Sequence, residues 1–267
     1  CFLDHLQADM PRGWRTAPYL NVFDLACGDG RFSRQIIDML QKRLGKQIRY
    51  AAVDVNPEFV AAARLRIPEG TIYEGNIFED HLSRFMPAGF NIDIVLLSHA
   101  VYFAMDKCAL AERLSTLGNA DTLTLYLMND PIYRQVPKDV DALIGALEQA
   151  ELPYIQSAPF NSHVQMPERA LDYIAHLFAA PNANYPDEAF QTTRRLLFFF
   201  QQCPLERLTP PVRFEFLRSV LTDLRKYGGK IPVRNHWIAV LRKDSRHPFR
   251  QAVKAAMLHM NSLPLNL

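Results

Sequence analysis

The chain has 267 residues, of which 49% are hydrophobic and 22% charged, so it can bury one large core or one core with an appendage. Its formal net charge of +2 disfavours a dedicated nucleic-acid or acidic-membrane binder and makes a small ligand the default. The apolar runs are far short of the ~20 residues that span a bilayer, and the N-terminus lacks the layout of a signal peptide.

The first half of the chain alternates strand and helix patterns. Residues 1–19 predict a short helix and a lead-in loop, to which we assign no chemistry. Strands are then expected at 19–25, 48–55, 71–73, 92–97 and 121–128, and helices at 31–44, 57–65, 79–85, 106–117 and 140–152. Five such alternations predict a doubly wound, Rossmann-like α/β sheet, whose ligand lies at the carboxyl ends of the strands beside the first one.

The pattern changes after residue 152. A strand is expected at 154–165, helices at 167–178, 187–202 and 210–227, and a final strand at 231–241. We expect the last two strands to join the sheet antiparallel, which gives a mostly parallel, seven-stranded sheet with a helical lid or small lobe inserted between them. The predicted segments are a core over 1–153, the last strands with their insertion over 154–242, and a helical tail over 243–267.

A Gly-X-Gly turn at Gly28 and Gly30 separates the first strand from the first helix. Such a turn alone is a weak signal, because glycine is also needed simply to turn the backbone. Ser33 stands where a dinucleotide fingerprint has Gly or Ala, and Asp29 disfavours a pyrophosphate and favours a cation. Asp54 ends the second strand, where a carboxylate can bind both hydroxyls of a ribose. These residues predict a positively charged, phosphate-free nucleoside.

Four motifs resemble, in order and spacing, those of class I S-adenosylmethionine-dependent methyltransferases. They are Asp24-Leu-Ala-Cys-Gly-Asp-Gly30, Val53-Asp-Val-Asn-Pro57, Glu74-Gly-Asn-Ile-Phe78 and Ile92 to His99. The resemblance implies S-adenosylmethionine as the cofactor. It implies that Asp24, Gly28 and Gly30 surround the methionine part of the cofactor and that Ser98 lies near the methionine or the methyl group. It implies that Asp54 binds the ribose, that Val55 and Phe59 border the adenine, and that Asn76 and Ile77 meet the edge and face of the adenine. The other candidate cofactor-binding residues are Ala26, Asp29 and Phe78. The family's third glycine is replaced here by Phe32-Ser33.

A narrower similarity, to small-molecule N-methyltransferases of the histamine methyltransferase type, rests on the helical insertion and on the aromatic segment after the fourth strand. His99 is the candidate general base, with a strand cap as the alternative. Tyr102 and Phe103 are candidates for an aromatic wall around a cationic group, or core residues. Asn129, His163 and His236 are further candidate substrate residues, with ordinary turn and edge positions as the alternative.

The predicted function is methyl transfer to a small-molecule acceptor, with nitrogen favoured over oxygen, mainly through orientation, which can supply ~7–11 kcal/mol. The alternative of another class is a non-catalytic S-adenosylmethionine-binding or scaffold domain of a larger assembly. A protein or nucleic-acid methyltransferase is less favoured because the chain has no basic excess, and a nicotinamide dehydrogenase is disfavoured by Asp29 and Ser33. The expected partner is the small-molecule acceptor, without nucleic acid or membrane; a homodimer or a longer chain stays open.

Cysteine usage bears on the compartment. The four cysteines, at positions 1, 27, 108 and 203, form no Cys-X-X-Cys pair and no zinc-like spacing with histidine, so we expect neither a disulfide framework nor a metal site. We therefore expect a reducing, cytoplasmic environment. The first residue is Cys rather than Met, which leaves N-terminal targeting open.

Overall fold

The computed structural model describes residues 11–130, 139–157, 160–201, 205–245, 250, 251, 253 and 254. These residues form two compact units, each with its own apolar core. The first unit contains 11–128, 139–157 and the described residues from 236 onward, and the second contains 129, 130, 160–201 and 205–235. The units do not coincide with the predicted segments 1–153, 154–242 and 243–267.

The first unit contains most of the alternating elements that the sequence predicts. Their bounds are α2 Arg12–Thr16, β1 Tyr19–Leu25, α3 Arg31–Leu44, β2 Gln47–Asp54, α4 Pro57–Arg66, β3 Thr71–Glu74, η1 Leu82–Phe85, β4 Ile94–Ser98, η2 Val101–Phe103, α5 Lys107–Ser115, β5 Leu123–Asp130, α6 Asp139–Gln149 and β6 Tyr154–Gln156. The strands β1, β2 and β4 are buried along almost their whole length, as expected for strands covered on both faces.

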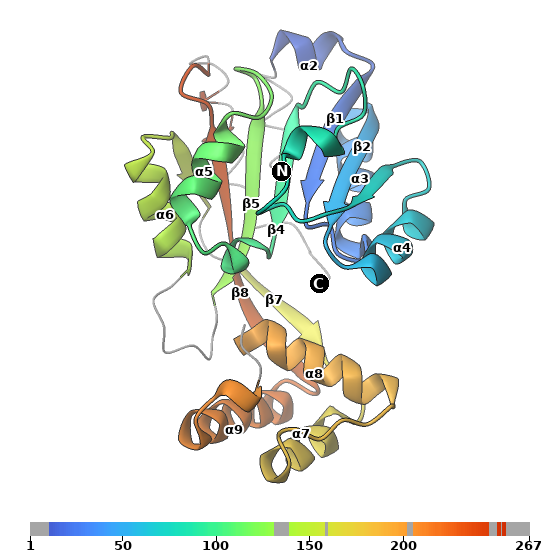
Figure 1. Ribbon diagram of the computed structural model, residues 1–267, viewed down its shortest axis with the longest axis vertical. Coiled ribbons are helices and arrows are strands. Elements are labelled where there is room, and N and C mark those ends of the chain that lie inside the picture. The colour runs from blue at the N-terminus through green and yellow to red at the C-terminus, as the bar shows by residue number, and fades with distance from the viewer. Residues whose placement is uncertain are drawn as a thin grey trace. The chain divides into compact units, whose positions relative to one another are not determined.

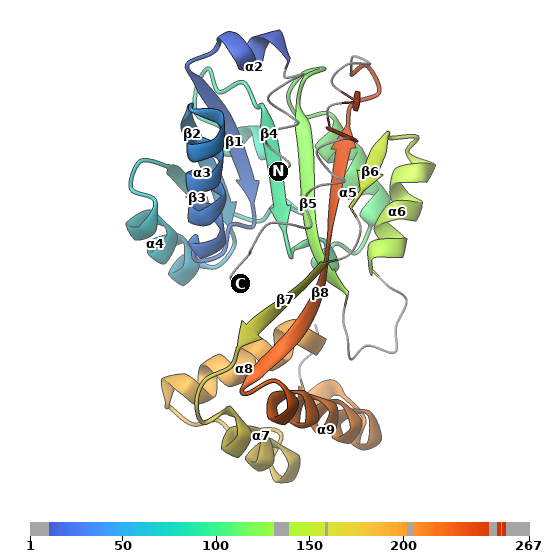
Figure 2. The same cartoon turned by 180° about the vertical axis from the view of Figure 1, so that it is seen from behind.

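The described strands form one sheet in the order β3-β2-β1-β4-β5-β8-β6, with β7 Phe160–Gln165 paired to β8 Lys230–Leu241 outside this order. The pairs β1–β2, β1–β4, β2–β3 and β4–β5 are parallel, whereas β6 and β7 run antiparallel to β8. The helices α3 and α5 lie on opposite faces, with α4 beside α3 and α6 beside α5 (Figures 1 and 2). The fold is therefore a doubly wound, Rossmann-like and mostly parallel sheet, as predicted, and its switch point lies between β1 and β4.

Within the described residues, the predicted count of seven strands is corrected to eight. The strand expected at 154–165 is two strands, β6 and β7, which both pair with β8. At Ser157 the side-chain oxygen accepts the backbone N–H of Trp237 at 3.1 Å, and the backbone N–H of Ser157 donates to the Trp237 carbonyl. A hydroxyl thus takes the place of a backbone acceptor, which ends the regular ladder of β6.

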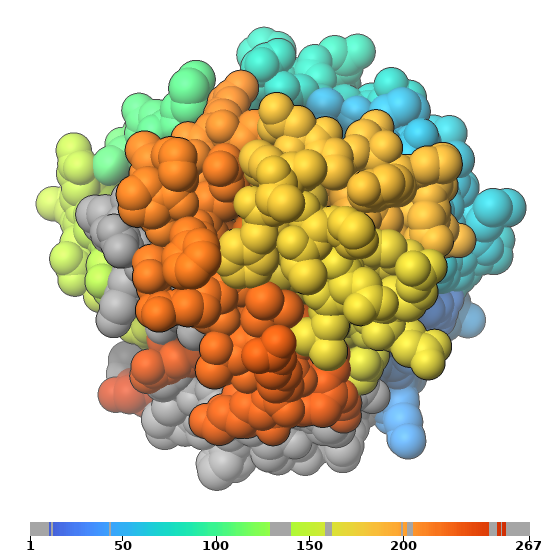
Figure 3. Space-filling model, turned by 90° about the horizontal axis from the view of Figure 1, so that it is seen from below, coloured from blue at the N-terminus to red at the C-terminus, as the bar shows by residue number. Residues whose placement is uncertain are grey.

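The second unit contains the helical insertion between β7 and β8. Its helices are α7 Ala170–Ala179, α8 Glu188–Gln201, the 3₁₀ turn η3 Leu205–Arg207 and α9 Pro210–Lys226. The core between them includes the fully buried Phe190, Leu197 and Leu217. Residues of this segment, coloured yellow to orange, form the surface that faces the viewer in Figure 3.

The predicted C-terminal tail over 243–267 is described only in part. Residues 250, 251, 253 and 254 are helical, and most of the remaining tail lies outside the described residues. None of the helices in the described part of the chain is both long and apolar enough to cross a bilayer.

Candidate functional site

The two glycines of the turn between β1 and α3 have different local surroundings. Both have positive φ, +57° at Gly28 and +77° at Gly30, which favours glycine. A Cβ at Gly30 would lie 3.1 Å from the Cα of Ala63 and 3.2 Å from its Cβ, so this glycine lets α3 approach α4. A Cβ at Gly28 would meet no atom within 4 Å, so Gly28 faces open space in which a ligand can lie.

Asp54 joins the glycine turn to the end of β2. Its Oδ2 accepts the backbone N–H of Gly28 at 2.8 Å, and its Oδ1 accepts that of Asn56 at 2.9 Å. The side chain is buried, yet the two carboxylate oxygens have about four acceptor positions in total, so capacity remains for further donors. A phosphate at this turn would have to compete with a carboxylate for the Gly28 N–H and would be repelled by it.

Asp29 does not present the unpaired carboxylate that the sequence argument assumed. Its Oδ1 accepts the backbone N–H of Arg31 at 3.1 Å, and its Oδ2 lies 2.9 Å from Arg31 Nε and 3.2 Å from Arg66 Nη1. Two guanidinium groups therefore offset its charge. Asp54, which accepts a hydrogen bond from the turn itself, therefore disfavours a pyrophosphate there more directly than Asp29 does.

Asp24 lies at the centre of a buried network beneath the turn. Its Oδ2 accepts hydrogen bonds from Ser33 Oγ at 2.6 Å and from Tyr50 Oη at 2.7 Å, whereas Oδ1 is buried without a hydrogen-bond partner. Burial raises the pKa of Asp24 from 3.8 to about 6; the two hydroxyl donors oppose this shift, and the charge of Asp54 adds to it. Ser33, which stands where the resembled motif has glycine, therefore donates a hydrogen bond to the carboxylate of Asp24.

Sequence reasoning missed Tyr50. The alternation of side chains along β1 and β2 could have identified it, because Val22 pairs with Tyr50 and Asp24 pairs with Ala52. Residues two apart on a strand share a face, so Asp24 and Tyr50 lie on the same face of neighbouring strands. A polar tip on an otherwise apolar strand, diagonal to a buried carboxylate, predicts such a hydrogen bond.

The loop after β3 contains Asn76 and is tied to Asp54 through the backbone. The N–H of Gly75 donates to the Asp54 carbonyl at 3.0 Å. Asn76 closes a tight turn, since its Oδ1 accepts the N–H of Phe78 at 3.0 Å and its own N–H donates to Asp80 Oδ2 at 2.9 Å. The side-chain NH₂ of Asn76 can still donate to a ligand.

The apolar residues expected around an adenine differ in exposure. Val55, directly after β2, is 65% exposed, and Phe59 is half-buried on α4. Ile77 is buried in the core, and its carbonyl accepts Arg113 Nη1 at 2.7 Å. Val55 can therefore cover a flat ring without rearrangement, whereas the Ile77 side chain is already covered by protein.

An aromatic segment follows β4. His99 has φ +54°, unusual for a residue other than glycine, and its N–H donates to the Leu127 carbonyl at 2.8 Å. Its Nδ1 lies 3.4 Å from Tyr102 Oη, and the two rings stack with centroids 6.5 Å apart. Phe103 meets Tyr102 edge-on at 6.4 Å and is 53% exposed. Strained backbone of this kind clusters at functional sites, and Ser98, half-buried, precedes it at the strand end.

The remaining candidate substrate residues are Asn129, His163 and His236. Asn129 lies in β5, and its side chain is outside the described residues. The strand segments that contain His163 and His236 meet across the ladder, where Phe160 pairs with Asn235, but the register places Pro232 and not His236 opposite His163. The exposed His163 contacts the ring of Tyr227, whereas His236 is buried, with Nδ1 3.3 Å from Gln156 Nε2.

The comparisons with known proteins concern the fold. No family model matches the chain, and no curated protein matches it. Solved structures that resemble it include a TehB-like SAM-dependent methyltransferase from Corynebacterium glutamicum (17% identity, TM-score 0.41, 60% of this chain and 75% of that chain). Others are the YcgJ protein of Bacillus subtilis (12%, 0.48, 90% and 97%) and a precorrin-6y C5,15-methyltransferase from Geobacter metallireducens (14%, 0.41, 61% and 75%).

Proposed function

We propose that the chain is an S-adenosylmethionine-dependent methyltransferase of small molecules, with nitrogen favoured over oxygen as the acceptor atom. The observation that carries this proposal is the hydrogen bond from the Gly28 N–H to the Asp54 carboxylate. It joins an N–H of the glycine turn to a carboxylate, and it leaves that carboxylate at the end of β2, where ribose hydroxyls are bound. A nucleoside without phosphates fits this arrangement.

The residues present fit this cofactor. Gly28 leaves open space at the turn, Asp54 has acceptor capacity for ribose hydroxyls, and the NH₂ of Asn76 can donate to a ring nitrogen. The exposed Val55 would pack against the flat base. S-adenosylmethionine supplies, when bound, an electrophilic methyl group on a sulfonium.

The chain's own residues would align the acceptor and handle its proton. The imidazole of His99 would accept the proton of an amine or hydroxyl. Tyr102 Oη, 3.4 Å from His99 Nδ1, would fix the orientation of that ring. Tyr102 and Phe103 would exclude water from the acceptor and contact a cationic amine through their ring faces.

Calorimetry on two glycine variants tests the donor site. S-adenosylmethionine and S-adenosylhomocysteine should bind the wild-type chain, and NAD should not. Gly28→Ala should lower the affinity for S-adenosylhomocysteine about tenfold or more, because the new methyl group occupies the space at the turn. Gly45→Ala is the matched control, since Gly45 also has positive φ and an open Cβ position but ends α3 at its other end.

Both variants should lose a similar ~1 kcal/mol of stability from left-handed backbone strain. Tight NAD binding, or equal affinity of the two variants for S-adenosylhomocysteine, would overturn the assignment of the turn. Production of S-adenosylhomocysteine with a panel of amines and phenols distinguishes an enzyme from a non-catalytic binding domain. Binding without turnover on the whole panel would favour the latter.

We also expect a reducing compartment such as the cytoplasm. The described cysteines, Cys27 and Cys108, are free thiols. Burial raises the pKa of the Cys27 thiol, with the charges of Asp24 and Asp54 adding to the shift, so it is kept in its unreactive form.

A further inference from the structure

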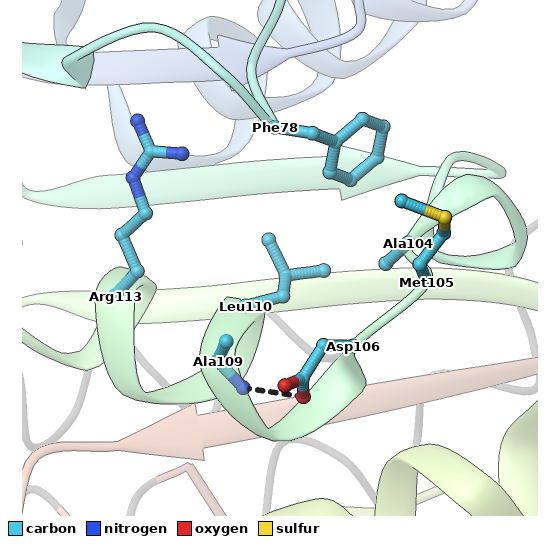
Figure 4. A pocket seen from close by; sticks show the side chains of 7 residues that line it. All are labelled: Phe78, Ala104, Met105, Asp106, Ala109, Leu110 and Arg113. Atoms are coloured by element: carbon cyan, nitrogen blue, oxygen red, sulfur yellow. Dashed lines mark hydrogen bonds between the residues drawn. The ribbon is translucent and has the colours of Figure 1, made fainter.

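A pocket of about 220 Å³ lies in the first unit, between the loop after β3 and the helix α5. Figure 4 shows its lining, with Phe78 on one side and α5 on the other. The residues that α5 and its cap contribute are Asp106, Ala109, Leu110 and Arg113, and Ala104 and Met105 close one end. Their spacing of three, four and seven residues places them along one face of a helix, over a length of ~10 Å.

The middle of this pocket is apolar, and its rim has apolar surface in contact with water. Phe78, Ala109 and Leu110 line the middle. Met105 at the rim is fully exposed, and the nearby Phe103 is 53% exposed. An apolar body placed here would remove water from these side chains, which favours binding in proportion to the area covered.

A cation lies at one end. Arg113 Nη1 donates to the Ile77 carbonyl at 2.7 Å, so the guanidinium is held in place while its Nε and Nη2 donors can bind a ligand. A fixed guanidinium edge matches the two oxygens of a carboxylate. Asp106, two helical turns away, caps the N-terminus of α5, because its Oδ1 accepts the N–H of Ala109 at 2.9 Å. At ~10 Å from Arg113 its exposed charge is largely screened at physiological salt.

We propose that this pocket binds a small carboxylate with an apolar body, such as a single-ring aromatic acid, with the carboxylate on Arg113 and the ring between Phe78 and Leu110. The proposal does not depend on methyl transfer. Phe78 is common to this pocket and to the candidate cofactor residues, whereas Arg113 and Leu110 belong to the pocket alone. The preference for acid over amide, which depends on Arg113, therefore distinguishes a failure of this proposal from a failure of the donor site.

The test is ligand-observed NMR and calorimetry on the full chain with 3-phenylpropionate, and with 3-phenylpropanamide as the neutral analogue. The acid should bind about tenfold or more tightly than the amide, because only the acid forms a charge-assisted pair with Arg113. Arg113→Met should remove this preference. Arg218→Met, at an exposed site on α9, makes the same charge change and should leave it intact.

A second pair of variants tests the apolar part. Ala109→Trp, at an exposed position that lines the pocket, should fill it and abolish binding of the acid. Ala61→Trp, at an exposed position on α4, should bind the acid within about twofold of wild type. Equal affinity for acid and amide in the wild-type chain, or unchanged binding in the folded Ala109→Trp variant, would overturn the proposal.

Discussion

Asp24 is a buried carboxylate that ionises close to neutral pH. It is 1% exposed, and its two hydrogen bonds come from the hydroxyls of Ser33 and Tyr50 on a single oxygen. Burial raises its pKa to about 6, so the ionised form present above that pH is retained in the interior at a loss of stability. The buried network next to the candidate donor site is therefore sensitive to pH.

Asp24→Asn should reveal this sensitivity. A pKa raised from 3.8 to about 6 stabilises the folded chain fully below pH 3.8, and this stabilisation is lost as the pH rises through 6. The free energy of unfolding of the variant minus that of wild type should therefore increase by up to about 3 kcal/mol between pH 4 and pH 8. Urea unfolding at several pH values measures the gain.

Tyr50→Phe provides a companion measurement. It removes one of the two hydrogen bonds that favour the ionised carboxylate, so the pKa of Asp24 should rise further and the loss of stability should continue to higher pH. A difference between Asp24→Asn and wild type that stays constant from pH 4 to pH 8 would contradict this account of Asp24.

At the scale of elements, Asn56 both follows β2 and begins α4. Its Oδ1 accepts the N–H of Glu58 at 2.9 Å as the helix cap, and Pro57 occupies the first turn. Its backbone N–H meanwhile donates to Asp54 Oδ1. The side chain thus stabilises the helix, and the backbone holds the carboxylate.

Asn56→Ala separates the two roles. Loss of the cap should lower the free energy of unfolding by about 1 kcal/mol, and Asn56→Ser should restore most of it. The affinity for S-adenosylhomocysteine should stay within about twofold, because the backbone N–H remains on Asp54. If affinity fell tenfold or more in the folded Asn56→Ala variant, the side chain of Asn56 would have to contact the ligand directly.

Periodicity was sufficient to predict most elements and the doubly wound sheet, because each pattern reports burial within a short window. The proximity of Gly28 and Asp54 could also be predicted, since both follow strands that pair in parallel. What local patterns could not supply were side-chain partners distant in sequence. Arg66 offsets Asp29 from 37 residues away, and the Ser157 hydroxyl replaces a ladder bond to Trp237 from 80 residues away.

At the scale of the molecule, one strand contributes to both cores. Ile231 and Val233 of β8 belong to the core of the second unit, and Ile238 and Val240 belong to that of the first. The boundary between the units lies within this strand, so each core, these four residues included, is built from residues of its own unit. Separate cores predict that the two units open as separate cooperative regions.

Hydrogen exchange on a reciprocal pair of core variants tests this. Leu217→Ala removes a fully buried side chain of α9, and Leu97→Ala removes one of β4, each at a loss of ~2–5 kcal/mol to its own core. Leu217→Ala should speed exchange across α7, α8 and α9 and leave β1, β2 and β4 protected, and Leu97→Ala should do the reverse. Uniform loss of protection across both units in either variant would show a single cooperative unit instead.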